Sequence, residues 1–257
     1  MSILSVRDIT VQFGGLKAND KISFDVPAGS IFAVIGPNGA GKTTLFNVIS
    51  GFFPPTEGEV FFAEQNLAGL AQHEVSTLGL VRTYQLVQLF TDLTVLENVK
   101  IGCHRVTHGG IFASLFRPQW MKEQERAVED KAKACLDFVG LGSVADMQAG
   151  KLPYGQQRLL EVARALASEP KLLMLDEPAA GLNVQETSAL ADVIERINAR
   201  GVTVVLVEHD MGLVMRVAQK MIVIDFGIKI AEGTPEHIKQ HPDVIAAYLG
   251  GTETVDV

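Results

Sequence analysis

Hydrophobic and polar positions alternate along the first part of the chain. Residues 9–13 and 22–26 each place an apolar side chain at every second position, and residues 58–62 (GEVFF) are a candidate for a further strand. A period of two is typical of strands that bury one face. The pattern therefore predicts an N-terminal antiparallel β lobe.

Further along, the apolar residues form unbroken runs instead. Such runs are typical of strands that are buried on both faces. They are SIFAVI at 30–35, LLML at 172–175, VTVVLV at 202–207 and MIVI at 221–224. Helical stretches separate them and end near Gly or Pro, at 43–50, 156–168 and 184–199. Alternation of buried strands with helices predicts a mostly parallel core sheet.

The middle of the chain has a different character. Residues 123–140 carry apolar side chains on one helical face, whereas residues 86–120 are apolar and rich in loop-forming residues. We therefore expect one domain over residues 1–257 with three parts. These are a nucleotide-binding core (1–85 with 150–232), an inserted helical lobe (86–149) and a tail (233–257) with a short helix and a frayed polar end, TETVDV.

Composition narrows the classes of partner. The chain has 257 residues, and 22 Lys and Arg against 30 Asp and Glu give a net charge of −8. A net negative charge argues against a nucleic-acid partner, because proteins usually bind nucleic acids through a positively charged surface. The chain shows no apolar leader and no spanning run free of Gly and Pro, so we expect a soluble cytoplasmic protein. Cys103 and Cys135 lack metal or disulfide spacing, which favours reduced thiols.

Residues 36–43 read GPNGAGKT and fit the phosphate-loop pattern G-x-x-x-x-G-K-[ST]. An apolar run precedes the pattern and a helical stretch follows it, which distinguishes the loop from a chance glycine turn. Glycines let backbone N–H groups point at phosphate oxygens. Lys42 supplies the cation for the β- and γ-phosphates, and the Thr43 hydroxyl can ligate Mg²⁺. The residues predicted to contact the nucleotide are Gly36, Pro37, Asn38, Gly39, Ala40, Gly41, Lys42, Thr43 and Thr44.

A second element must complete the metal site. In KLLMLDEP, Asp176 ends a buried run, and ligands gather at the carboxyl ends of strands in such sheets. Asp176 is therefore the expected Mg²⁺ partner. Glu177, directly after it, can polarise a water molecule; the alternative is a carboxylate that is merely solvated.

Four segments, GPNGAGKT, LPYGQQR, LMLDEP and VLVEHD, together resemble the ATP-binding subunits of ABC transporters over nearly the whole chain. FGGLKA, EPAAGLN and PDVIAAYLG are similar to the subunits of branched-chain amino acid importers (the LivG type), whose close relatives import urea or short amides. The resemblance implies an α/β phosphate-loop NTPase with a mostly parallel core sheet, an antiparallel β lobe and an inserted helical lobe.

The resemblance also gives a role to LPYGQQR. In the family, two ATPase subunits pack head to tail, and each ATP lies between the phosphate loop of one and the signature loop of the other. Tyr154, Gly155 and Gln156 would then contact the ATP of the facing subunit. The commonest form of the signature is LSGGQ, so Pro153 here lacks both a hydroxyl and an N–H, and Tyr154 replaces a glycine. A plain helix cap is the alternative interpretation.

Four further positions carry over from the family. Phe13 would stack on adenine, although it shares a predicted strand face with core residues. Gln85 would touch Mg²⁺ and the attacking water, with Gln88 as a neighbouring competitor. His209 would contact the γ-phosphate, and a structural histidine is the alternative. Asn183 stands beside the nucleotide interface where many relatives have Asp.

These features predict the ATPase subunit of an importer, with ATP and Mg²⁺ as cofactors. Glu177, His209 and Lys42 form the expected catalytic set. The expected partners are two polytopic membrane permease subunits, contacted through residues 86–120, and a second ATPase subunit, for which a non-identical chain is favoured and a second copy of this chain is the alternative. A solute-binding protein outside the membrane is an indirect partner. The subunit would lie on the inner face of the cell membrane. A transporter of urea, amides or another solute, and a soluble ABC ATPase without a transport role, are the alternatives.

Overall fold

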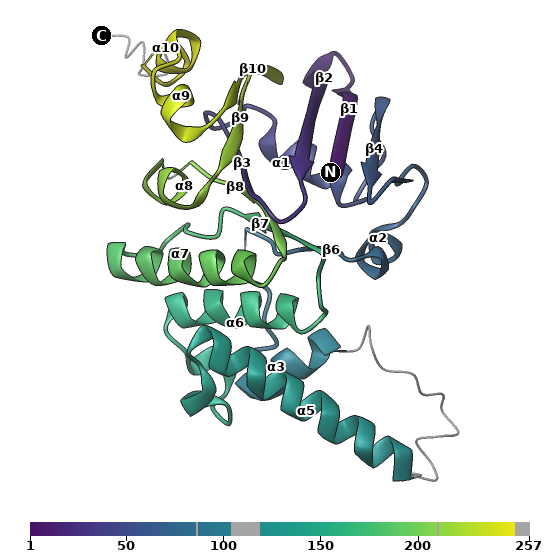
Figure 1. Ribbon diagram of the computed structural model, residues 1–257, viewed down its shortest axis with the longest axis vertical. Coiled ribbons are helices and arrows are strands. Elements are labelled where there is room, and N and C mark those ends of the chain that lie inside the picture. Colours follow the sequence, from purple (N-terminus) through teal and green to yellow (C-terminus); the bar gives the residue numbers. More distant parts are fainter. Residues whose placement is uncertain (86, 104–118, 210, 250–257) are drawn as a thin grey trace. The chain divides into compact units, whose positions relative to one another are not determined.

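The computed structural model describes residues 1–85, 87–103, 119–209 and 211–249 (Figure 1). The chain divides into two compact units. The first, here the sheet unit, consists of Met1–Arg82, Lys171–Ala180 and Thr187–Val257. The second, here the helical unit, consists of Thr83–Pro170 and Gly181–Glu186. Among the described helices none is long and apolar enough to cross a membrane. The predicted frayed end at 252–257 lies outside the described residues.

The predicted antiparallel lobe is a four-stranded sheet in the order β2-β1-β4-β5. Its strands are β1 (Ser2–Phe13), β2 (Leu16–Pro27), β4 (Glu57–Phe62) and β5 (Gln65–Asn66). β2 follows the expected alternation, because Ile22, Phe24 and Val26 are buried while the residues between them are partly exposed. The prediction of this lobe is confirmed.

β1 departs from strict alternation at Thr10, which is 4% exposed between buried Ile9 and Val11. The register of β1 against β2 shifts between Val6 and Ile9 and again between Ile9 and Val11. Such irregularities interrupt the two-residue period of side-chain direction. The buried hydroxyl of Thr10 accepts a hydrogen bond from the Lys21 N–H at 3.2 Å, which satisfies its polarity.

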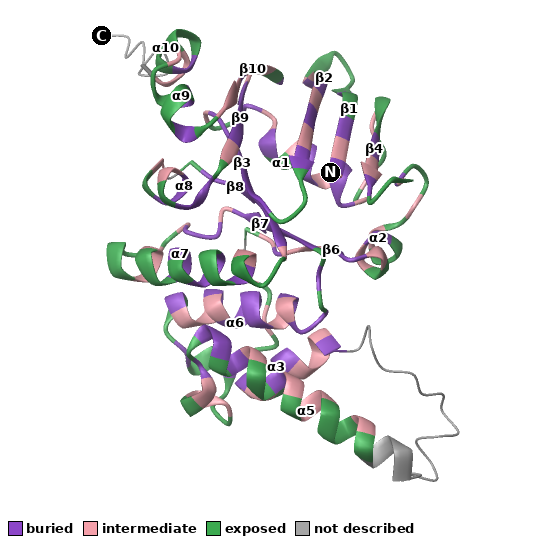
Figure 2. Cartoon of the chain, in the orientation of Figure 1, coloured by how far each residue is buried: buried purple, intermediate pink, exposed green. Residues whose placement is uncertain are grey.

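The core sheet has six strands in the order β10-β9-β3-β8-β7-β6, and it is parallel from β9 to β6. Its strands are β3 (Ile31–Ile35), β6 (Leu80–Arg82), β7 (Leu172–Asp176), β8 (Thr203–Val207), β9 (Lys220–Asp225) and β10 (Ile228–Gly233). The four predicted apolar runs became β3, β7, β8 and β9. Every residue of β3, β7 and β8 is buried (Figure 2). The two strands that were not predicted, β6 and β10, are the short or half-exposed strands at the sheet edges.

One helix joins the two sheets of the sheet unit. The hydrophobic core combines Leu45 and Phe46 of α1 (Lys42–Ile49) with Val6 of β1 and Val34 of β3, so α1 lies between the sheets (Figure 1). The ring of Phe24 stacks on that of Phe32 with centroids 5.4 Å apart, which joins β2 directly to β3. The phosphate-loop pattern is thus held at the start of a helix that is packed on two sides.

The remaining helices of the sheet unit are mostly short. They are α2 (Gln72–Leu78), α8 (Met211–Val217), α9 (Pro235–Lys239) and α10 (Pro242–Leu249). The predicted tail helix is therefore two helices. α7 (Val184–Ala199) has the predicted bounds, and its first three residues belong to the helical unit.

The helical unit contains α3 (Val95–Gly102), α5 (Gln119–Val139) and α6 (Tyr154–Leu166), with 3-10 turns at Gly142–Val144 and Ala149–Lys151. α3 lies within residues 86–120, the part of the predicted helical lobe that was expected to be rich in loops. Thr94 begins this helix with a capping box: its Oγ1 accepts from the Glu97 N–H, and Glu97 Oε2 accepts from the Thr94 N–H at 2.8 Å. α6, which the sequence assigned to the core, is grouped here with α3 and α5. Much of the predicted membrane-subunit contact falls on residues 104–118, which lie outside the described residues.

Candidate nucleotide site

The phosphate loop connects β3 to α1, and its backbone has positive φ at its glycines. Gly36 has φ +152° and Gly41 has φ +98°. A Cβ on Gly36 would lie 2.0 Å from the carbonyl oxygen of Ile224, so no larger residue fits. Lys42 is 5% exposed, and its Nζ donates to the carbonyls of Gly36 at 2.7 Å and Pro37 at 2.8 Å. The side chain of Lys42 therefore folds back and forms hydrogen bonds with the phosphate loop itself.

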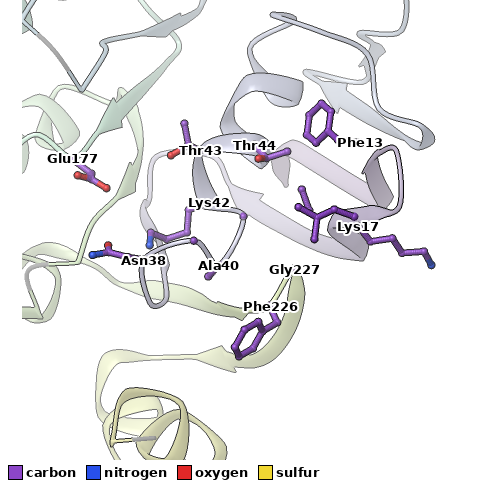
Figure 3. A pocket seen from close by; sticks show the side chains of 14 residues that line it. Phe13, Lys17, Asn38, Ala40, Lys42, Thr43, Thr44, Glu177, Phe226 and Gly227 are labelled. Carbon is purple, nitrogen blue, oxygen red and sulfur yellow. The ribbon is translucent and has the colours of Figure 1, made fainter. Parts of the chain in front are cut away.

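A cavity of about 510 Å³ opens beside this loop, a size within the range of small-molecule sites. It is lined by Phe13, Leu16, Lys17, Ala18, Asn38, Gly39, Ala40, Gly41, Lys42, Thr43, Thr44, Glu177, Phe226 and Gly227. In the view of Figure 3, Thr43 and Thr44 lie between Glu177 and Phe13. The structure thus brings most of the predicted loop residues to one cavity with the predicted base.

Phe13 stands at the wall of this cavity. Its side chain is 54% exposed, whereas Ile9 and Val11 are buried, and its ring contacts Phe53 edge-on with centroids 5.8 Å apart. Packing in the core, the alternative for Phe13, is therefore excluded. Contact with adenine stays a prediction. Phe226, which is 86% exposed, lines the same cavity. No sequence pattern indicated it, because the β9–β10 turn is distant from the phosphate loop along the chain and lies near it only in the folded protein.

The carboxylates follow the carboxyl end of β7 as predicted. Asp176 is 2% exposed, and its Oδ2 accepts from Arg82 Nη2 at 2.6 Å. Glu177 has a left-handed backbone with φ +44°, and its N–H donates to the Val207 carbonyl at 2.9 Å. Because β7 and β8 are neighbours, Glu177 Oε2 lies 3.7 Å from His209 Nδ1. The structure therefore places the predicted base beside the predicted switch histidine.

The charges around Lys42 have opposing effects. Burial lowers the pKa of Lys42, while the nearby carboxylates of Glu177, Asp176 and Glu208 raise it. Glu208 is fully buried and accepts from the N–H of Ala179 at 2.7 Å, so it fixes the chain just after the carboxylates. The site is therefore a buried cation among three acidic groups, which is suited to a ligand that brings its own metal ion and phosphates.

The C-terminal segment also reaches the loop. Burial raises the pKa of Tyr248 in α10 to about 12, and the backbone N–H of Gly36 acts against this rise. Tyr248 thus lies beside the first residue of the phosphate loop. No local pattern along the chain indicates this contact, since the two residues are far apart in the sequence.

The signature segment occupies the start of α6 in the helical unit. Pro153 is the N-cap and provides no side-chain cap, Tyr154 is 43% exposed and Gly155 is buried. A Cβ on Gly155 would lie 2.4 Å from Glu186 Oε1, so glycine is required there. Gln156 follows in the first turn and is partly exposed.

Gln85 is exposed, and its backbone is tied to α6. Arg158 donates to the backbone carbonyl of Gln85 through Nη2 and to that of Tyr84 through Nη1 at 3.0 Å. Gln88, its competitor, is also exposed. Asn183 has a structural function, because its Oδ1 accepts from the N–H groups of Gln185 at 2.9 Å and Glu186 at 3.0 Å at the start of α7.

A phosphate loop between a buried strand and a helix, with two carboxylates at the end of another parallel strand of the same sheet, defines a phosphate-loop nucleoside triphosphatase. Residues 19–180 match the family model of the ABC transporter, and residues 229–254 match that of the branched-chain amino acid ATP-binding cassette transporter. The chain belongs to the ABC transporter family and is an ABC ATPase, the ATP-binding subunit of a transporter.

Curated relatives and solved structures agree with this assignment. The chain is 43% identical to the high-affinity branched-chain amino acid transport ATP-binding protein LivG of Escherichia coli K12, over 96% of this chain and 98% of that protein. It is 44% identical to BraF of Pseudomonas aeruginosa over the same shares. The ADP conformation of MJ1267, a cassette of an ABC transporter, superposes with a TM-score of 0.85 at 35% identity, covering 97% and 99% of the two chains. A nucleotide-free cassette gives a TM-score of 0.82 at 34% identity, covering 96% and 99%.

Proposed function

We propose that this ABC ATPase powers an importer of branched-chain amino acids. The observation that carries the proposal is the match of residues 229–254, beyond the nucleotide-binding segment, to the branched-chain amino acid cassette family. The relatives LivG and BraF support it, because their names state that transport function. Import of urea, amides or another solute is the second candidate, since such ATPases resemble these relatives closely.

In the proposed site, the loop N–H groups and Lys42 bind the phosphates of ATP, and Phe13 lies against the adenine. Thr43, Asp176 and Gln85 would hold Mg²⁺, which neutralises phosphate charge when it is bound. The donor set fits this ion, because the hydroxyl of Thr43, the carboxylate of Asp176 and the amide of Gln85 all offer oxygen atoms. Mg²⁺ at nucleotide sites takes one or two carboxylates and completes its shell with phosphates and water.

Glu177 is the proposed general base. Its carboxylate accepts a proton from the attacking water, and His209, 3.7 Å away, contacts the γ-phosphate and orients Glu177. The side chain of Glu177 is 13% exposed, so it is partly shielded from solvent while it lines the cavity. Hydrolysis then removes the contacts that ATP makes between two subunits.

The proposed assembly is a pair of ATPase subunits on two polytopic permease subunits at the inner face of the cell membrane. Tyr154, Gly155 and Gln156 complete the ATP site of the facing subunit, which we propose to be a related but non-identical ATPase. A solute-binding protein delivers the amino acid on the outer side. We propose no nucleic-acid partner, consistent with the net charge of −8.

The test is a tagged purification from native membranes in mild detergent, with the co-purifying proteins identified by mass spectrometry. We expect two multi-span membrane proteins and a second ATPase. Reconstitution of that complex in vesicles, with uptake of labelled leucine compared with labelled urea, then decides the solute. Ribosomal or DNA-bound partners without membrane proteins would instead support a soluble ABC ATPase.

A further inference from the structure

Arg82 is a buried cation at the carboxyl end of β6. Its side chain is 4% exposed, and its Nη2 lies 2.6 Å from Oδ2 of Asp176, whose side chain is 3% exposed. The other terminal nitrogen, Nη1, donates to Asn47 Oδ1 at 2.8 Å and to Ser50 Oγ at 2.9 Å. The guanidinium also lies 5.7 Å from the ring centroid of Phe46. Arg82 therefore connects β6 to the phosphate-loop helix α1 and to the end of β7.

Burial of this pair calls for a functional explanation. Removing two charges from water is costly, and such pairs are often replaceable by apolar residues without loss of stability. Lys42, another buried cation of the sheet unit, donates from its Nζ to the carbonyls of Gly36 and Pro37. Among the ion pairs of the described residues, Arg82 is the cation within salt-bridge distance of Asp176.

The pairing is directed at one oxygen of the carboxylate. Arg82 uses Oδ2, and its planar guanidinium is fixed by the two hydrogen bonds to α1, so the orientation of Asp176 is set by the helix that carries Lys42 and Thr43. Gln85, the third proposed metal ligand, follows Arg82 by three residues in the chain.

We propose that Arg82 is the positioning residue of Asp176. It supplies the counter-charge of this carboxylate when no Mg²⁺–nucleotide is bound, and it holds Oδ2 so that Oδ1 is the oxygen offered to the metal. This proposal rests on the proposed magnesium role of Asp176. It makes Arg82 a resident cation in balance with Mg²⁺, so the two compete for the charge of a single carboxylate.

The proposed competition predicts the direction in which removal of Arg82 changes the melting temperature and the Mg²⁺ affinity. In Arg82→Met, the buried carboxylate of Asp176 loses its ion-pair partner, and only the weaker, longer-range charge of Lys42 acts on it until Mg²⁺ binds. The melting temperature Tm of the nucleotide-free protein should fall, and the rise of Tm on adding a non-hydrolysable ATP analogue with Mg²⁺ should exceed that of the wild type. The Mg²⁺ concentration for half of this rise should drop on the order of tenfold, because charges at this separation interact strongly in partly buried sites.

The experiment records Tm by calorimetry with the analogue in EDTA and then across a Mg²⁺ titration, so it does not depend on turnover. Arg216→Met is the matched control, because it removes an exposed ion pair with Asp192 and should leave the Mg²⁺ midpoint unchanged. The double variant Arg82→Met, Asp176→Asn removes the unpaired charge. It should recover nucleotide-free stability and lose the enhanced Mg²⁺ response.

Arg82→Lys provides a second route if Arg82→Met does not fold. Lysine keeps the charge but cannot contact Asn47, Ser50 and Asp176 together, so a smaller increase of the Mg²⁺ response is expected. An equal loss of Tm with and without Mg²⁺, in either variant, would overturn the proposal and leave Arg82 as a packing residue. A wild type that lacks any Mg²⁺ response would overturn the magnesium role of Asp176 as well.

Discussion

Glu177 combines three properties at one residue. Its backbone is left-handed, which is costly for a residue with a Cβ, its N–H is anchored to Val207, and its carboxylate faces His209. An unfavourable backbone at a cavity wall is a reason to look for function there. The conformation turns the chain so that Asp176 stays buried with Arg82 while Glu177 lines the cavity.

Glu177→Gln should therefore separate binding from chemistry. The amide keeps the size of the side chain but cannot accept the proton of the attacking water, so turnover should fall by about 10²–10⁴. ATP binding should persist, because Lys42 and the loop are untouched. Phosphate release by the complex measures turnover, and binding of a fluorescent ATP analogue measures whether ATP binding persists. Turnover at the wild-type rate would remove Glu177 from the role of base.

Two glycines of the phosphate loop allow the cost of a positive φ to be separated from the cost of a steric clash. Gly36→Ala places a Cβ 2.0 Å from the Ile224 carbonyl oxygen, whereas a Cβ on Gly39, at φ +78°, meets nothing within 4 Å. Gly36→Ala should lower the free energy of unfolding by about 3 kcal/mol or more, since backbone must move. Gly39→Ala should cost about 1–2 kcal/mol for its left-handed conformation. Urea unfolding measures both, and equal losses would contradict the close approach of β9 to the loop.

At the scale of elements, α6 carries its own buried ion pair. Arg158 and Glu161 are each 3% exposed with Nη1 and Oε2 3.3 Å apart, and Arg158 also holds the backbone carbonyls of Tyr84 and Gln85. Burial raises the pKa of Glu161 above its ordinary 4.5, and Arg158 acts against that rise. The helix that bears the signature segment and the loop that bears Gln85 therefore share one charged anchor.

Arg158→Met should destabilise the protein in a pH-dependent manner. Without Arg158 the pKa of Glu161 rises further, so the folded protein keeps a proton that the unfolded chain loses above pH 4.5. Stability then falls as the pH rises, and the loss relative to wild type should be larger at pH 8, up to roughly 3–5 kcal/mol, than at pH 5.

Urea unfolding at both pH values measures this difference. The double variant Arg158→Met, Glu161→Leu serves as the control, because it removes both charges and should regain much of the loss at pH 8. An identical loss at pH 5 and pH 8 would show that Glu161 is not the partner that matters.

Elements with strong local signals were predictable from the sequence. β3, β7 and β8 are unbroken apolar runs, and α7 has the predicted bounds because Asn183 caps its start and Gly201 follows its end. α3 was missed although Thr94 and Glu97 form a capping box, since its apolar surroundings were interpreted as loop. A capping pattern was thus a better guide there than hydrophobic periodicity.

Contacts between distant segments were not predictable in this way. The loop pattern indicated Lys42 and Thr43, and the strand-end rule indicated Asp176, but neither indicated Arg82, which lies 94 positions before Asp176 and meets it because β6 pairs with β7. Phe226 likewise enters the cavity through the β9–β10 turn. Pairing of strands decides such contacts, and a single sequence carries no local sign of it.

At the scale of the whole molecule, the atypical signature bears on assembly. In the proposed dimer, the start of α6 meets the γ-phosphate bound by the facing subunit. Pro153 gives this helix no side-chain cap and has no N–H, and Tyr154 presents a ring that is 43% exposed. A copy of this chain is therefore poorly equipped to complete the ATP site of another copy. A subunit with a serine and a glycine at these positions would supply the missing polar contact.

We accordingly predict that the Glu177→Gln chain alone stays monomeric with ATP and Mg²⁺ and pairs one to one with the second ATPase of its complex. Sedimentation velocity at micromolar concentration measures this, with ADP in place of ATP as the control. Introducing the common form by Pro153→Ser and Tyr154→Gly should raise self-association by about tenfold, equivalent to about 1.4 kcal/mol, because a hydroxyl donor to phosphate is gained and a bulky ring is lost. A wild-type homodimer that is tight at this concentration and drives transport with the membrane subunits would contradict the prediction, since the signature as it stands would then be sufficient in both subunits.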